Sequence, residues 1–225
     1  MLEMDWQALY AAKAVLLEGM GITLQITAVA IACGLALGTV LAVLSLSPNR
    51  LLKAGSHAYV ALFRSIPLVM LLLWFFLIVP QCLKTLFDLP PTVDVRLISA
   101  MVAYALLEAA FFCEIIRAGI ATLPRGQIHA AQALGMTPAQ SMRYVILPQA
   151  FRAMVPVALT QCIVIFQDTS LVYVIALGDF FRRMTAIGER DGTLIPMLLL
   201  AGSTYWVIST ALIAMTRVLR TRLAR

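Results

Sequence analysis

The sequence predicts an all-α membrane protein with about five transmembrane helices and no separate soluble domain. Of its 225 residues, 62% are hydrophobic and only 12% are charged, whereas a soluble domain averages about 45–50% apolar and about 25% charged residues. The apolar residues gather in five runs that carry few charges, and a membrane-spanning helix needs roughly 20 such residues. This composition excludes an ordinary soluble domain and places the whole chain in a membrane.

The first span follows an acidic N-terminus. The stretch MLEMDWQALY has no basic cluster, so it is not a cleavable signal peptide. Residues 5–18 resemble a short amphipathic helix lying in the membrane interface, and we treat 1–18 as a separate N-terminal segment. Residues 19–49 contain no charge, which predicts the first transmembrane helix at about 22–44. Gly34 and Gly38 form a GxxxG pattern in this helix, which we interpret as a packing site.

The other four spans are separated by shorter polar segments. A turn at 47–49 and a basic loop with Arg50 and Lys53 precede the second span. The third span is interrupted only by Glu108 and Glu114, and the fourth is short, being uncharged over 153–167. A loop precedes the third span, a polar stretch precedes the fifth, and a basic tail ends the chain. We place the spans at 65–83, 97–116, 149–167 and 196–216, and the intervening segments at 84–95 and 168–192, with the tail at 218–225.

The basic residues orient this arrangement. They carry the net charge of +6 but are not clustered with aromatic residues, so they favour membrane topology over nucleic-acid binding. Five spans put the termini on opposite faces, and 11 of the 17 basic residues fall on one face. Positive charge accumulates on the cytoplasmic side. We therefore expect the N-terminus outside and the C-terminus in the cytoplasm. The 11 are Arg50, Lys53, Arg64, Arg117, Arg125, Arg143, Arg152, Arg217, Arg220, Arg222 and Arg225.

The segment 117–148, on the same cytoplasmic face, predicts a helical hairpin between the third and fourth spans. A short helix over 127–134 would end at Gly135, a helix C′ position. Thr137 would cap a second helix, with Pro138 at its first position and Gln140 completing a capping box. Pro148 would end or kink that helix. The alanines of the first arm (Ala130, Ala131, Ala133) leave room for another protein, so we interpret the hairpin as a docking element.

The hairpin also resembles a known motif. Ala130-Ala131, Gly135 and Val145-x-Leu147-Pro148 are similar to the EAA motif of the membrane subunits of type I ABC importers, although His129 stands where that motif opens with Glu. In that family the loop is the coupling helix, which seats in a cleft of a separate ATPase subunit. The resemblance implies that His129, Ala130, Ala131, Gly135, Val145, Leu147 and Pro148 form the ATPase-coupling loop.

Longer runs extend the resemblance over nearly the whole chain, so that 19–217 would be the transmembrane domain. FRSIPLVMLLLWFFLIVP, LPQAFRAMVP, FQDTSLVYV and IGERDGT look like the polar amino acid branch of these importers, and most like a glutamate/aspartate importer. That branch implies a bacterial inner-membrane complex. Its other parts would be two ATPase subunits, a second membrane subunit that is identical or homologous, and an extracytoplasmic solute-binding protein.

The chain carries no sign of chemistry of its own. It has no GxxxxGK[ST] phosphate-binding loop and only two histidines, His57 and His129. Its four cysteines show no metal-ligand spacing. We therefore expect no catalytic set, no metal and no cofactor on this chain, and we expect ATP to be hydrolysed on a partner subunit.

Glu108 is the candidate for selectivity, because an ionisable group inside a span costs ~2.5 kcal/mol or more if it faces lipid. It could meet the ammonium of a zwitterionic substrate, or it could be hydrogen-bonded to Gln161 or a nearby hydroxyl. Gln161 and Asp168 are seven residues apart and would share a helical face. Glu114 would pair locally with Arg117. We expect the translocation path to include Glu108, Gln161, Gln167 and Asp168.

Two other classes of protein compete with an importer subunit. An ion-coupled secondary carrier usually has internal repeats and charges at the membrane midplane, and here there is no repeat and one midplane acid. A scaffold or insertase-like protein would not need an ordered cytoplasmic hairpin. Of the three classes, only an importer subunit requires a stoichiometric ATPase partner, so co-purification would distinguish them.

Overall fold

A computed structural model of the chain describes residues 10–87 and 94–223. Within these ranges the regular structure is helical throughout, which confirms the all-α prediction. In chain order the elements are α2 (Lys13–Ser45), α3 (Arg50–Ser65), α4 (Leu68–Leu77), α5 (Val79–Phe87), α6 (Arg96–Ala121), α7 (Arg125–Ala133), α8 (Pro138–Ser141), the π-helix η1 (Met142–Ile146), α9 (Leu147–Asp168), the 3₁₀-helix η2 (Thr169–Ile175), α10 (Phe180–Asp191) and α11 (Leu194–Leu223).

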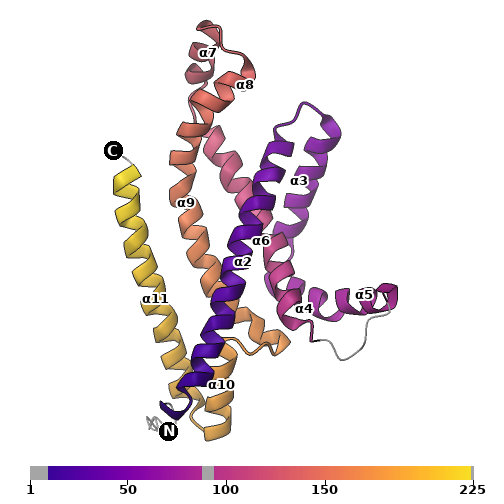
Figure 1. Cartoon of the computed structure of the whole chain (residues 1–225), viewed down its shortest axis with the longest axis vertical. Coiled ribbons are helices and arrows are strands. Elements are labelled where there is room, and N and C mark those ends of the chain that lie inside the picture. Colours follow the sequence, from indigo (N-terminus) through magenta and orange to yellow (C-terminus); the bar gives the residue numbers. More distant parts are fainter. Residues whose placement is uncertain (1–9, 88–93, 224–225) are drawn as a thin grey trace.

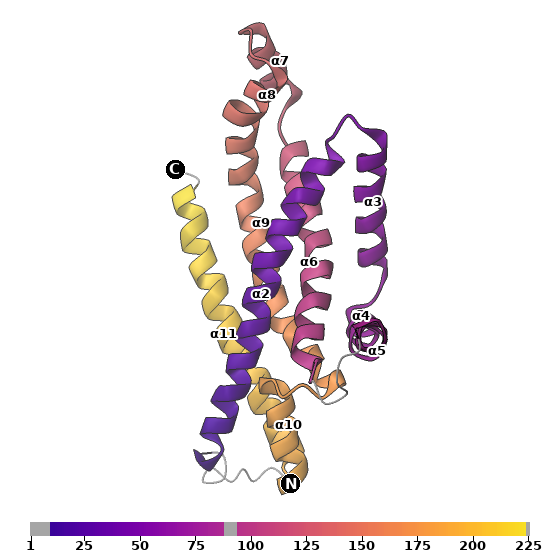
Figure 2. The ribbon, with the colours of Figure 1, turned by 45° about the vertical axis from the view of Figure 1, so that its right-hand side comes forward.

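The long helices run side by side along the long axis of the molecule (Figures 1 and 2). In the described ranges, four helices are each long and apolar enough to cross a membrane. The bent pair α3 and α4 makes a fifth if it is counted as one broken span. The α7–α8 hairpin lies at one end and α10 at the other. The start of α2 lies near α10, whereas α11 ends toward the hairpin end. The described part of the chain therefore begins and ends toward opposite ends of the bundle.

The second span differs from the expected straight helix at 65–83. The expected basic loop is helical, because Asn49 caps α3 by accepting a hydrogen bond from the Leu51 backbone N–H. The helix stops at Ser65, and the axis turns by 99° before Leu68. Pro67 causes the break. It lacks an N–H and disfavours helical backbone in the preceding residue, and Ile66 is extended at φ −100° and ψ 128°.

The N-terminal segment 1–18 and the polar stretch 168–192 also differ from the prediction. Residues 13–18 form the first turns of α2 instead of a separate interfacial helix, and residues 1–9 lie outside the described ranges. The polar stretch 168–192 contains η2 and α10. Asp179 caps α10 and Gly192 ends it at φ +68°. Phe180, Met184 and Ile187 are spaced along one face of α10, where they pack against α2 and α11.

Helix α2 packs more extensively on α6 than on any other element. The contact uses small residues four apart, since Ala30, Gly34, Gly38 and Ala42 are all buried. A Cβ atom added at Gly34 would lie 2.7 Å from the Cβ of Glu108, and one at Gly38 would lie 2.7 Å from the Cβ of Phe112. The predicted packing role of the GxxxG pattern is confirmed.

This contact makes Gly38→Ala a test of the fold. The added methyl would lie 2.8 Å from the carbonyl oxygen of Ala109, which cannot move without shifting α6. We expect the solubilised protein to lose about 1–3 kcal/mol of stability, measured as a lower thermal unfolding midpoint. Gly21→Ala is the matched control, because Gly21 lies on the same helix and a Cβ added there would meet no neighbouring element within 4 Å. Equal midpoints for the two variants would contradict close α2–α6 packing.

Candidate functional site

The hairpin has the turn that its sequence predicts. Gly135 has φ +78°, and its N–H donates to the Gln132 carbonyl at 2.9 Å. The Met136 N–H donates to the Ala131 carbonyl at 3.1 Å. These two bonds form a Schellman motif, which satisfies the last carbonyls of α7 and requires a left-handed residue at C′. The position of Gly135 is therefore fixed by the backbone.

The second arm begins with the predicted capping box. The Thr137 hydroxyl accepts from the Gln140 N–H at 3.3 Å, and the Gln140 side-chain oxygen accepts from the Thr137 N–H at 2.9 Å. Pro138 occupies the first helical position. Caps on both sides of a two-residue connection hold the hairpin in one shape.

The helix does not end at Pro148. It passes through the π-turn η1 and continues as α9, with the Leu147 N–H donating to the Met142 carbonyl. Proline lacks the N–H of a regular helix and its ring crowds the carbonyl four residues earlier. A π-turn just before Pro148 widens the backbone there. The proline thus changes the helical register between the hairpin and the span.

The hairpin exposes most of the predicted coupling residues. His129, Ala130, Gly135, Leu147 and Pro148 are exposed, and Val145 is half-buried. Ala131 is the exception, because its side chain is buried. An apolar side chain not predicted for the site, Leu134, is 80% exposed beside the turn. The hairpin surface therefore combines small and apolar side chains with His129 and with exposed polar and basic residues such as Arg125 and Arg143.

Within the bundle, Glu108 lies on α6 and is only 2% exposed. It faces the bundle interior, not lipid, with its Cβ against Gly34 of α2. Gln161 of α9 donates its side-chain N–H to the Glu108 carboxylate at 2.9 Å. Two of the four predicted path residues are thus brought together across 53 positions of sequence. Gln161 was one of the two partners considered for Glu108 from the sequence, beside a nearby hydroxyl. The hydrogen bond is compatible with a packing role of Glu108 and with contact to a substrate ammonium.

The other two predicted path residues have different partners. The Gln167 side chain donates to the Ser209 hydroxyl of α11 at 3.1 Å. Asp168 ends α9, and its backbone carbonyl accepts from the buried Tyr104 hydroxyl of α6. Glu114 pairs with Arg117 at 2.8 Å, as predicted, and lies 3.8 Å from Arg64.

The α10 end of the molecule contains charged groups that the sequence did not single out. Arg183 pairs with Glu18 at 3.0 Å and donates to the Gly178 carbonyl at 2.7 Å. Burial raises the pKa of Asp179 to about 6, although two backbone N–H groups donate to its carboxylate. Arg96 pairs with Asp94 at 2.7 Å. The Arg183–Glu18 pair joins residues 165 positions apart, so no local sequence pattern indicates it.

Residues 34–225 match the family described as the binding-protein-dependent transport system inner membrane component. The chain belongs to this family. It is 55% identical over 224 residues to the glutamate/aspartate import permease protein GltK of Escherichia coli O157:H7, covering 100% of both chains. It is 34% identical to the arginine transport system permease protein ArtQ of Bacillus subtilis (strain 168), over 92% of this chain and 91% of that protein.

Solved structures agree with this membership. The permease superposes on a chain of an amino acid ABC transporter crystallised with histidines, with a TM-score of 0.87, 26% identity, and 98% and 99% coverage of the two chains. An inward-facing MetNI methionine ABC transporter gives a TM-score of 0.69 at 22% identity, covering 96% and 99%, and shows the shared fold alone.

Family membership decides between the classes of protein that the sequence left open. It identifies the chain as a multi-pass inner-membrane subunit of an ABC importer. This class is supported over an ion-coupled secondary carrier. Such permeases work with a separate ATPase and a second membrane subunit. The predicted type I importer fold and the resemblance on which it rested are confirmed.

Proposed function

We propose that this permease forms half of the translocation path for glutamate and aspartate, driven by ATP hydrolysis on a separate subunit. The substrate assignment rests on the 55% identity to GltK over the full length of both chains. The partners are an ATPase dimer, a second membrane subunit that is homologous or identical, and an extracytoplasmic solute-binding protein. The chain itself has no catalytic role and binds no cofactor.

The hairpin is the ATPase-coupling element in this proposal. Its turn is fixed by the Schellman motif and the capping box, and it extends beyond the long helices at one end of the bundle. The exposed Ala130 and Leu134 give a partner both space and apolar area. The π-turn η1 connects this surface directly to α9, which carries Gln161. Movement of the docked hairpin would therefore reach the Glu108–Gln161 pair through one continuous helix.

Transport assays test this function. The permease, its membrane partner, the ATPase and the binding protein are reconstituted in proteoliposomes, and labelled L-glutamate, L-aspartate and L-arginine are offered separately. We expect ATP-dependent uptake of the two acidic amino acids and little uptake of arginine. Arginine uptake without glutamate uptake would disprove the substrate assignment. Uptake without ATP would disprove the mechanism.

The orientation has its own prediction. The hairpin end carries Arg125 and Arg143, and positive charge favours the cytoplasmic side. We expect reporter fusions after Ala54 and Gln132 to read as cytoplasmic, and a fusion after Gly192 at the α10 end to read as extracytoplasmic. A cytoplasmic signal at Gly192 would reverse the proposed topology.

A further inference from the structure

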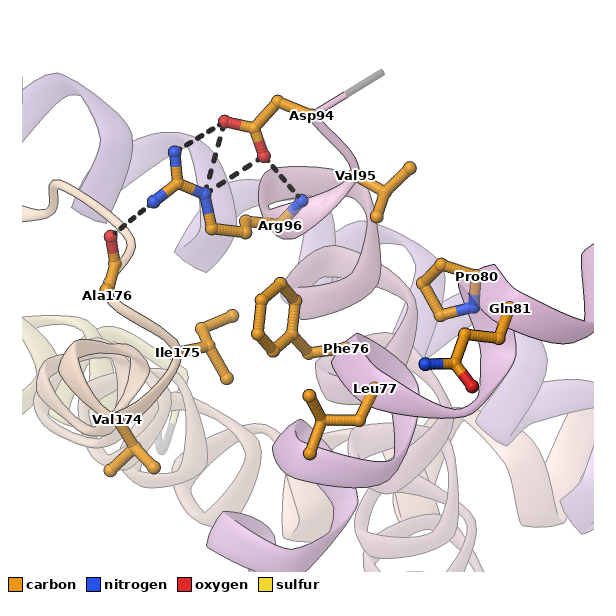
Figure 3. Close-up of a pocket in the computed structure, with 10 residues that line it drawn as sticks. All are labelled: Phe76, Leu77, Pro80, Gln81, Asp94, Val95, Arg96, Val174, Ile175 and Ala176. Atoms are coloured by element: carbon orange, nitrogen blue, oxygen red, sulfur yellow. Dashed lines mark hydrogen bonds and ion pairs between the residues drawn. The ribbon is translucent and has the colours of Figure 1, made fainter. Parts of the chain in front are cut away.

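An open cavity of about 480 Å³ lies where α6 begins, at the opposite end of that helix from the hairpin (Figure 3). One side consists of α4 and α5, and the other consists of the end of η2. Phe76 and Ile175 provide an apolar floor, and Gln81 provides an amide at the edge. Asp94 and Arg96 lie together along the remaining side. We call this the Asp94–Arg96 pocket. Its volume is in the range of small-molecule sites.

The two charges of the pocket are held in a fixed geometry. Arg96 donates from Nε to both oxygens of Asp94 at 3.0 and 3.1 Å, and from Nη2 to Oδ2 at 2.7 Å. The Arg96 backbone N–H also donates to Asp94 at 3.0 Å. These hydrogen bonds lower the pKa of Asp94 to about 2, so its carboxylate remains charged at any physiological pH.

Arg96 also reaches across the pocket to η2. Its Nη1 donates to the Ala176 carbonyl at 2.8 Å. Ala176 has φ +53° and is the one non-glycine residue with positive φ in the described part of the chain. This backbone costs an L-residue about 1–2 kcal/mol, and such strain concentrates at ligand clamps and switch regions. The arginine is thus fixed by partners on two elements before any ligand arrives.

The described residues do not use all the donors of the guanidinium. It has five N–H bonds, and its partners among the described residues use the one on Nε, one on Nη1 and one on Nη2. One N–H on each terminal nitrogen therefore has no acceptor in the described part of the chain, and the Arg96 side chain is 38% exposed. Asp94 is 58% exposed and its carboxylate has further acceptor capacity. A cation that has donors to spare beside an accessible anion is complementary to an amino acid zwitterion.

We propose that the Asp94–Arg96 pocket is an extracytoplasmic receiving site for the transported amino acid, with the substrate carboxylate on Arg96 and its ammonium on Asp94. This inference rests on the proposed function and its orientation. The methylene groups of the substrate would contact Phe76 and Ile175, and Gln81 would meet a second carboxylate.

The position of the pocket fits transfer toward the membrane centre. Phe76 and Ile175 belong to the same apolar cluster as Tyr104, whose hydroxyl donates to the Asp168 carbonyl. Glu108 lies twelve residues further along α6, which corresponds to roughly 18 Å on a helix. A substrate released into this pocket would lie at the outer end of the helix that carries Glu108.

The test measures equilibrium binding of labelled ligand to the assembled complex in nanodiscs, without ATP or binding protein. The ligands are L-glutamate and glutarate, a dicarboxylate without an ammonium group. We expect Arg96→Gln to weaken the binding of both ligands at least about tenfold, because each ligand loses a charge-assisted hydrogen bond to Arg96. Asp94→Asn should weaken L-glutamate similarly and leave glutarate unchanged or stronger. Arg190→Gln is the matched control, since Arg190 pairs with Asp191 at the same end but does not line the pocket.

The contrast between the two ligands separates binding from structure. A purely structural role for Asp94 would weaken L-glutamate and glutarate equally in Asp94→Asn, and this result would overturn the proposal. Absence of wild-type binding, or equal losses in Arg96→Gln and Arg190→Gln, would also overturn it. If Arg96→Gln does not assemble, the Asp94→Asn contrast still decides. Wild-type L-glutamate uptake, measured in parallel, reports separately on the proposed function.

Discussion

A complex carrying Gly135→Leu is expected to lose substrate-stimulated ATP hydrolysis, by at least about tenfold, while the permease still inserts into the membrane. Gly135 has φ +78°, and left-handed backbone costs an L-residue about 1–2 kcal/mol. A Cβ at this position would meet no atom within 4 Å. The loss therefore comes from strain in the Schellman turn and from bulk on the docking surface, not from a clash inside the permease.

Gly55→Leu is the matched control for this experiment. Gly55 lies on α3 toward the same end of the molecule, has no atom within 4 Å of an added Cβ, and has no positive φ. It should keep wild-type ATPase stimulation. The measurement is ATP hydrolysis in proteoliposomes with saturating binding protein and substrate, alongside the yield of assembled complex. Normal stimulation in Gly135→Leu would remove the hairpin from the coupling mechanism.

The hairpin was predictable because its determinants are local. Each hydrogen bond of the Schellman turn and of the capping box joins residues at most five positions apart. Residue types at those positions therefore suffice. The π-turn before Pro148 was not predicted, because the same proline can end, kink or widen a helix. Which of these occurs depends on how α9 packs in the bundle.

The broken second span shows what hydropathy alone leaves undetermined. Residues 65–83 form an uncharged run. Its hydropathy is the same whether the helix is straight or bent, so hydropathy does not distinguish the two shapes. Pro67 was visible but is compatible with the first turn of a helix. The bend became definite only with the contacts of α3, where Ser56 donates to the Leu41 carbonyl and Tyr59 to the Leu106 carbonyl.

The site residues that could be predicted from the sequence are those that are costly to place in a membrane without a partner. Glu108 stood out because an ionisable group inside a span must have a partner, and Gln161 was the partner considered. Gln167 has no such cost, and the structure directs it to Ser209 of α11. The Asp94–Arg96 pocket needs η2, 80 positions away, to complete it. Nothing in the local sequence indicates that Ala176 would lie there.

The Glu108→Gln complex is expected to assemble normally and to lose most of its glutamate uptake, by about tenfold or more. Glu108 is buried beside Gly34, so the substitution must not enlarge the side chain. The new amide has nearly the size of the carboxylate, and its oxygen can still accept the hydrogen bond from Gln161. The variant therefore removes the negative charge and little else. Loss of a charge-assisted contact to the substrate ammonium would account for this magnitude.

Glu114→Gln separates a role in the path from a general need for acidic residues on α6. Glu114 is on the same helix, but it pairs with Arg117 at 2.8 Å near the hairpin end, and pairs of this partly exposed kind contribute about 0–1 kcal/mol. It should transport at close to the wild-type rate. The decisive measurement is the initial rate of labelled L-glutamate uptake as a function of substrate-loaded binding protein, normalised to assembled complex. Wild-type rates in Glu108→Gln would leave the Glu108–Gln161 hydrogen bond as a packing contact, because a residue that binds substrate by its charge cannot lose that charge without effect.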